Sequence, residues 1–368
     1  MGAASDNSTS LSSNLSVSSS TVEESIAESW KLNGPYDSFG DFISDPQGRD
    51  NLIAVTILCL LGLFACVSNL LLVSVILRCH ETRSEPGYWF ITSSAFCELS
   101  MAAILLVFLV LAQMIQDENI PTYELNYRMM FFYNGFWYTY VIQLGVMSIN
   151  RLISITFPMS FKHIFSKSRT LMIIGCDFLA GFLIASPMLF SCCRMLYYFE
   201  YLSAVYENPL AWHRYLDFVI GFGPCPLIVS SYSFIFIKLR RNNKNMAALK
   251  RNISVKRDPE SQARNKVNAT ELRLLIQFMM FFICYFITSL VWFFMPYIST
   301  SKWSGFTMII LFPINNAISP IILFIFNKSV RTKVNAMFCF KHSKERTQSI
   351  NKGTSGNEVH SSAMNAAY

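Results

Sequence analysis

The sequence predicts an all-α membrane protein, a bundle of seven transmembrane helices followed by a short amphipathic eighth helix. Of the 368 residues, 52% are hydrophobic and only 14% are charged, whereas about a quarter of the residues in a soluble domain are charged. Seven apolar stretches are long enough for the roughly 20 residues that cross the hydrocarbon of a bilayer. Hydrophobic and polar residues do not alternate along them, which argues against a β-barrel.

The predicted spans cover residues 52–77, 88–115, 129–157, 168–191, 213–239, 272–298 and 304–326. Each is expected to be helical because lipid offers no hydrogen bonds to an open backbone. Residues 51–340 therefore form the seven-helix membrane domain with its eighth helix.

The two ends of the chain are expected to be disordered tails. Residues 1–50 are rich in Ser, Asn and Thr and offer little that packs. They carry the glycosylation sequons of Asn7 and Asn14, which predict an extracellular tail. Residues 341–368 are polar and are expected to form a cytoplasmic tail.

The positions of the basic residues predict the orientation in the plasma membrane. Lys and Arg concentrate after the first, third and seventh spans and between the fifth and sixth, while the opposite loops are acidic or mixed. Because basic loops stay in the cytosol, the amino terminus is expected outside and the carboxyl terminus inside.

Residues 327–340 predict the amphipathic eighth helix on the inner membrane face. Val330 and Val334 are expected to face lipid, with Lys328 and Arg331 on the polar side. Cys339 either carries a palmitoyl chain or remains a free thiol, since the motif is loose.

The sequence does not point to an enzyme. It has no metal-spaced Cys or His cluster, no pair of catalytic carboxylates and no nucleophile beside a base at membrane depth. We therefore expect no metal, no cofactor and no nucleic-acid partner. A transporter would show an inverted repeat, which is absent here, while a ligand-gated channel stays open as an alternative.

Three polar residues in the spans are costly to place in lipid and predict a function. Asn69 lies in the first span, Glu98 in the second and Arg151 at the end of the third. Glu98 is either a neutral acid hydrogen-bonded to a neighbouring helix or one wetted by an internal cavity. Arg151 is either an interfacial anchor or part of a signalling site, and physical chemistry alone leaves both open.

Several motifs resemble, in order and spacing, those of the rhodopsin-like G-protein-coupled receptors. They are Asn69, Glu98, Arg151 with Pro158, Pro224 with Tyr232, Phe281-x-x-Cys284-Tyr285, and Asn315-Asn316-x-x-Ser319-Pro320. The departures from the usual motifs resemble the divergent nematode serpentine chemoreceptors, and we take the Srx class as the subfamily.

The resemblance implies a chemosensory receptor that binds an extracellular small molecule or short peptide and activates a heterotrimeric G protein. A neuropeptide receptor of the same fold is the alternative, and arrestin and membrane lipids are further expected partners. The resemblance places G-protein coupling at Asn150, Arg151, Tyr232, Lys238, Arg240 and Arg273. It places an internal polar network at Asn69, Glu98, Asn315, Asn316, Ser319 and Pro320. It places the ligand pocket at Tyr133, Phe136, Trp137 and Tyr285.

Some departures change what the resemblance implies. Asn150 replaces the acid beside the motif Arg, so we expect a less tightly held resting state. The cysteines of the family's outer disulfide are missing from their usual places. Glu98 and Tyr140 alter the family's sodium pocket, so no bound sodium is expected.

The expected pocket suits an apolar or weakly polar ligand. Tyr133 stands where amine receptors carry an Asp, so an ammonium ligand would lack its counter-ion there. Trp292 and Tyr297 either line this pocket or belong to the interfacial aromatic belt, and the belt is the favoured interpretation.

Overall fold

The computed structural model describes residues 46–78, 86–114, 122–198, 201–208, 210–252, 259–327 and 330–335. Its helices are α3 (Pro46–Arg78), α5 (Pro86–Met114), α6 (Thr122–Thr156), α7 (Pro158–Ile164), α8 (Lys167–Ala185), η1 (Ser186–Leu189), α9 (His213–Phe222), α10 (Pro224–Asn252), α11 (Pro259–Ile298) and α12 (Lys302–Phe326). Its strands are β1 (Met195–Tyr198) and β2 (Ser203–Tyr206).

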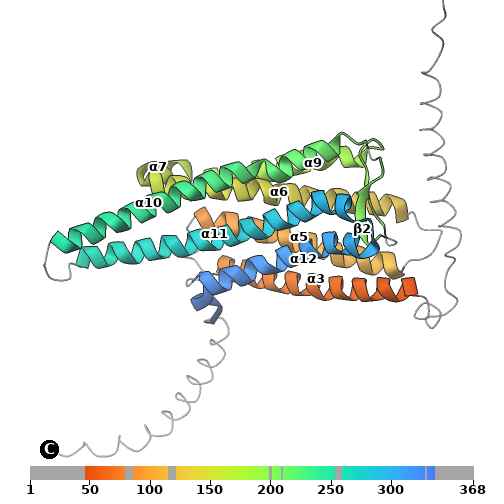
Figure 1. Ribbon diagram of the computed structural model, residues 1–368, viewed down its shortest axis with the longest axis horizontal. Helices are drawn as coiled ribbons and strands as arrows, with labels where there is room; N and C mark the ends of the chain where they lie inside the picture. Colours follow the sequence, from red (N-terminus) through yellow and green to blue (C-terminus); the bar gives the residue numbers. More distant parts are fainter. Residues whose placement is uncertain are drawn as a thin grey trace, which may run out of the picture.

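The long helices lie side by side as a bundle, which confirms the predicted fold class (Figure 1). Among the described residues, six helical segments are long and apolar enough to cross a membrane. One of them runs from His213 through Arg241 and joins α9 to α10. The break at Gly223 lies just before Pro224, which has no N–H to continue the helical hydrogen bonding.

Helix α6 is the seventh long helix of the described bundle, and it is not among the six segments that are apolar enough to be recognised as spans. It packs against α5, α8 and α10. Its Tyr138, Thr139, Tyr140 and Gln143 side chains are all buried. The Gln143 amide donates to Ser93 Oγ (2.7 Å) and accepts from Ser94 Oγ (3.1 Å), both on α5. The Gln143 amide of α6 therefore faces α5, which satisfies it.

Small residues bring α6 and α8 into close contact. A Cβ atom placed on Gly181 of α8 would lie 2.7 Å from the backbone N of Thr139 and 2.9 Å from the backbone O of Gly135. Only a residue without a side chain permits this approach, as in other membrane helix pairs.

Two helices run well beyond their predicted spans. The span 213–239 continues through α10 to Asn252, and the span 272–298 begins at Pro259 in α11. These extensions project together from the end of the bundle that also carries α7 (Figure 1). Hydropathy located the lipid-facing parts of these helices but not their polar continuations.

A short hairpin of β1 and β2 was not predicted. The strands pair antiparallel, with Met195 opposite Tyr206 and Tyr198 opposite Ser203. They lie across the end of the bundle where α3 and α6 begin (Figure 1). Strands of four residues are too short to give a clear alternating pattern in the sequence.

Several sequence predictions fall on residues that the structure does not describe. The two tails, the sequons of Asn7 and Asn14, and Cys339 lie outside the described residues. Of the eighth helix, residues 330–335 are described and are helical. The orientation predicted for Val330 is wrong, because its side chain is fully buried in the main hydrophobic core.

Candidate functional site

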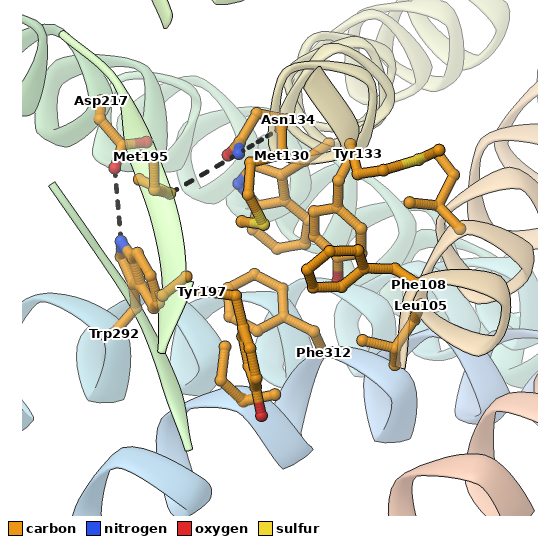
Figure 2. Close-up of a pocket in the computed structure, with 15 residues that line it drawn as sticks. Leu105, Phe108, Met130, Tyr133, Asn134, Met195, Tyr197, Asp217, Trp292 and Phe312 are labelled. Carbon is orange, nitrogen blue, oxygen red and sulfur yellow. Dashed lines mark hydrogen bonds between the residues drawn. The ribbon is translucent and has the colours of Figure 1, made fainter. Parts of the chain in front are cut away.

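A cavity lies between the helices directly beneath the hairpin (Figure 2). The space open to the centre of a water molecule is about 50 Å³, and the empty space between the lining atoms, including the open mouth, is about 650 Å³. The enclosed part of the cavity is therefore small, and most of the empty space belongs to its open mouth. The lining residues are Ile104, Leu105 and Phe108 of α5; Met129, Met130, Tyr133, Asn134 and Trp137 of α6; Met195, Tyr197 and Ala204 of the hairpin; Asp217 of α9; Trp292 of α11; and Ile309 and Phe312 of α12.

Aromatic rings form one wall of the cavity around Phe312. Its ring lies edge-on to Tyr133, Trp137 and Trp292, with centroid distances of 6.2, 4.8 and 5.5 Å. Edge-to-face contacts at these distances are favourable. The wall therefore joins α6, α11 and α12 through one ring cluster.

Two polar side chains reach the cavity. The Asp217 carboxylate accepts a hydrogen bond from Tyr138 Oη (3.1 Å) and one from Trp292 Nε1 (3.3 Å). The Asn134 amide donates to the Met130 carbonyl (2.8 Å) and contacts the Met195 sulfur (3.7 Å). Figure 2 shows Asp217 above Trp292, and Met195 reaching toward Asn134.

Asp217 was missed by the sequence reasoning. The expectation that a cationic ligand would find no counter-ion considered only Tyr133 in the third span and took no account of Asp217, which also lines the cavity. The acid in the predicted span 213–239 was itself a signal, because ionisable groups within spans mark functional sites.

Two of the four predicted pocket residues line the cavity. Tyr133 and Trp137 are four residues apart and so share one face of α6. Phe136 does not, because it is turned toward α8, where its ring contacts Phe178 and Phe182. Tyr285 lies beyond Trp137 and donates its hydroxyl to the Gly221 carbonyl.

The belt interpretation is wrong for Trp292, which lines the cavity and donates to Asp217. Tyr297 is 76% exposed, as a belt residue would be. The two residues lie five positions apart, which turns their side chains to different sides of α11.

The residues predicted for the internal polar network lie on α3, α5 and α12. Asn69 of α3 donates to the Asn316 carbonyl of α12 (2.9 Å) and to the Ala65 carbonyl (3.0 Å). Ser319 donates to the Asn315 carbonyl (3.4 Å), one turn before Pro320 in the same helix. The network thus connects α3 to α12.

Glu98 faces a second, smaller cavity. The space open to the centre of a water molecule there is about 20 Å³, and the lining includes Ser94, Tyr140 and Ser319. A polar cavity needs about 10–15 Å³ by this measure to hold one water molecule. The structure accommodates both readings of Glu98: Tyr140 and Ser319 lie within hydrogen-bonding reach of its carboxyl group, and the cavity beside it has room for one water molecule.

At the other end of the bundle, Arg151 contacts an aromatic pair. Its guanidinium lies 5.1 Å from the ring centroid of Phe278 on α11. That ring stacks on Tyr232 of α10, at 6.4 Å and 16°. Among the described residues Arg151 forms no ion pair, so the contact between α6 and α11 is a cation–π contact.

The other residues predicted for G-protein coupling surround this contact. Lys238 donates to the Ile155 carbonyl (3.0 Å), one of the last carbonyls of α6, where a cation complements the helix dipole. Asn150 is 2% exposed, and its amide nitrogen has no hydrogen-bond partner among the described residues. Arg240 and Arg273 are exposed on α10 and α11.

The hairpin that covers the cavity is held on α6 without a disulfide. Asn126 donates to the Tyr197 carbonyl and accepts from the Tyr197 N–H, both at 2.9 Å. The Tyr123 hydroxyl donates to Glu207 (2.7 Å) and accepts from Arg194 (3.0 Å). The hydrogen bond to Tyr123 raises the pKa of Arg194, so the guanidinium stays charged.

A family model described as serpentine-type 7TM GPCR chemoreceptor Srv matches residues 69–340. The chain belongs to this family. The match confirms the prediction of a serpentine chemoreceptor of the G-protein-coupled class. It does not show the Srx class, since the matched class of this receptor is Srv.

The Srv receptor also resembles two curated receptors over part of their length. The cannabinoid receptor type 1B of Takifugu rubripes is 26% identical over 204 residues, which are 54% of this chain and 42% of that protein. The cannabinoid receptor 1 of Xenopus laevis is 25% identical over 205 residues, with the same coverage. The chain thus spans about two fifths of the length of each relative.

The crystal structure of squid rhodopsin resembles this Srv receptor with a TM-score of 0.67 at 16% identity, over 80% of this chain and 87% of that one. At this identity the likeness concerns the fold, which it shows to be that of rhodopsin.

Proposed function

We propose that this Srv receptor binds an extracellular small molecule in the cavity beneath the hairpin and activates a heterotrimeric G protein at the opposite end of the bundle. The observation that carries the proposal is the position of α11. Trp292 of this helix lines the cavity, and Phe278 of the same helix contacts Arg151. The fourteen helical steps from Phe278 to Trp292 span about 21 Å at 1.5 Å per residue.

Signal transfer in this proposal is a shift between two positions of α11. A ligand that touches Trp292 and binds better when α11 has moved outward shifts the population toward that state. The same movement separates Phe278 from Arg151. A groove then opens between α6, α10 and α11, into which a helix of the G protein fits.

The cytoplasmic residues have separate roles in the proposal. Arg151 and Tyr232 contact the inserted G-protein helix once Phe278 has moved. Lys238 holds α10 on the end of α6, while Arg240 and Arg273 offer positive charge to the G protein, to arrestin and to anionic lipid. Asn150 is no carboxylate, so among the described residues the aromatic contact is what restrains Arg151.

The polar network connects the two ends. The Asn69–Asn316 hydrogen bond holds α3 on α12, and Glu98, Asn315 and Ser319 lie around the small cavity and the helix turn before Pro320. Polar contacts of this kind exchange partners at low cost when helices move. We assign the network to the coupling between ligand cavity and cytoplasmic groove.

The proposal places the receptor in the plasma membrane, with the hairpin outside and the α10–α11 extensions inside. Asn7 and Asn14 are then available for glycosylation, and Cys339 for palmitoylation. The covering hairpin and the size of the cavity favour a small molecule over a peptide.

The test is ligand-dependent nucleotide exchange. Full-length receptor in membranes, screened with water-soluble and volatile small molecules, is expected to accelerate exchange on a promiscuous Gα subunit. A ligand response that persists as a membrane current in cells lacking heterotrimeric G proteins would contradict the proposal and favour a channel.

A further inference from the structure

The Asp217 carboxylate is a buried acid that forms no ion pair among the described residues; Arg214 acts on it only through space. It is 4% exposed. The ion pair found among the described residues is Arg128–Glu124 on the surface of α6. Arg214, the basic residue three positions before Asp217, points elsewhere: it donates to the Tyr297 hydroxyl (3.2 Å) and lies over that ring.

Donor groups of the protein occupy only some of the hydrogen-bond acceptor sites of this carboxylate. Tyr138 and Trp292 each donate one hydrogen bond, one to each oxygen, and the Tyr206 hydroxyl is a third partner, whereas an ionised carboxylate has about four acceptor sites. A buried charge with incomplete compensation is costly to hold. The remaining acceptor sites lie on a residue that lines the cavity.

The surroundings of Asp217 suit an organic cation rather than a metal ion. Trp292 and Trp137 present aromatic rings to the cavity, and such rings attract a nearby cation. The rest of the lining is apolar, with Met129, Met130 and Met195 as adaptable side chains. Within the described residues no group of His, Cys, Asp and Glu side chains has a metal-binding arrangement.

We infer that the cavity takes a small organic amine, with its ammonium group against Asp217 and its apolar body against Phe312 and Trp137. The inference rests on the proposed function in one respect, because it takes this cavity as the ligand site. Hydrogen bonds to a charged group contribute roughly tenfold to a hundredfold in affinity. Amines are therefore distinguished from neutral molecules of the same shape.

The experiment compares matched pairs of compounds on purified full-length receptor. The pairs are 2-phenylethylamine with 2-phenylethanol, and hexylamine with hexanol. Each pair shares its apolar body and differs in the ammonium group. The measurement is the shift in the thermal unfolding midpoint with compound concentration, which reports binding without any G protein.

The expected result is stabilisation by an amine at concentrations at least about tenfold below those of its alcohol. Asp217→Asn should remove this preference and leave the weak effect of the alcohol. Asp177→Asn is the matched control, because Asp177 is another acid, 5% exposed, on α8 and away from the cavity. It should keep the preference.

Equal stabilisation by amine and alcohol, or none by either amine, would overturn the inference on the wild-type protein alone. The same holds if Asp217→Asn keeps the amine preference. Failure of the proposed function is seen separately: an amine that stabilises the receptor without accelerating nucleotide exchange contradicts signalling and leaves the amine site in place.

Discussion

At the end of the bundle that carries α7, a cation–π contact stands, among the described residues, where an acidic partner would hold Arg151. Asn150 is buried beside it and carries no charge, while Phe278 lies 5.1 Å from the guanidinium. Cation–π contacts contribute about 0.5–1 kcal/mol at exposed sites and more when desolvated. The resting contact between α6 and α11 is therefore weak enough for a ligand to shift.

Removing the guanidinium is expected to abolish coupling. Arg151→Ala should reduce receptor-stimulated nucleotide exchange at least tenfold with unchanged surface expression, because Arg151 is the cation at the mouth of the groove. Arg169→Ala is the control, since Arg169 is exposed and bonds only to the nearby His163 carbonyl. Unchanged exchange in Arg151→Ala would contradict the assigned role.

Removing the ring is expected to have the opposite effect. Phe278→Leu should raise basal nucleotide exchange about two- to fivefold, which corresponds to the loss of about 0.5–1 kcal/mol from the resting state. Phe282→Leu serves as control, because Phe282 stacks on Phe286 of the same helix instead. Lower or equal basal exchange in Phe278→Leu would count against a restraining role.

Among the structural elements, the hairpin of β1 and β2 is attached to α6 by polar contacts where the wider family is expected to use a disulfide. Asn126 pairs with both backbone groups of Tyr197, as a neighbouring strand would. Arg194 lies over the rings of Tyr123 and Tyr127, at 5.4 and 4.6 Å. Several weak contacts thus hold the cover of the cavity, so it can open without a covalent change.

Loss of the amide pair should loosen this cover. Asn126→Ala removes two hydrogen bonds, each worth about 0.5–1.5 kcal/mol. Amide hydrogen exchange in residues 195–206 should become faster, on the order of tenfold or more. In Asn208→Ala, which removes only a local bond to Leu210, exchange in the hairpin should stay slow. Equal protection in both variants would show that the amide pair does not hold the hairpin.

The close contact of α6 with α8 can be tested by substituting two different glycines of α8, one at the contact and one away from it. Gly181→Ala places a Cβ atom against the Thr139 backbone and should destabilise the receptor by about 1–3 kcal/mol, as overpacking does. Gly175→Ala meets nothing within 4 Å and should leave the thermal midpoint unchanged or higher. Equal midpoints for the two variants would refute the close contact.

At the scale of the whole molecule, α11 joins the two ends of the bundle: its Trp292 lines the cavity and its Phe278 contacts Arg151. The bundle begins at the hairpin end with α3 and finishes with α12 toward the α7 end (Figure 1). A chain with seven crossings has its termini on opposite sides.

Tag accessibility tests this topology. An epitope at residue 1 should be stained in intact cells, and one at residue 368 only after permeabilisation. A tag in the α10–α11 connection, at residues 253–258, should behave like the carboxyl-terminal tag, because basic loops remain in the cytosol. Staining of both ends in intact cells would contradict the seven-span topology.

The sequence by itself determined the class of fold and the place of each span. Lipid requires long apolar helices wherever the chain crosses it, so hydropathy alone located them to within a few residues at most ends. Costly polar groups such as Asn69, Glu98 and Arg151 stood out for the same reason. Asp217 carries the same signal, but the prediction about a counter-ion for the ligand considered only the third span.

Only the tertiary structure decided which side chains meet. Phe136 and Trp137 are neighbours in the chain, yet one faces α8 and the other the cavity, because each residue turns about 100° around the helix axis. The rotation of each helix follows from contacts with distant residues, such as Gly181 against Thr139 and Trp292 against Asp217. Such contacts join parts of the chain that local sequence patterns treat separately, so the cavity and its acid emerged only from the packed bundle.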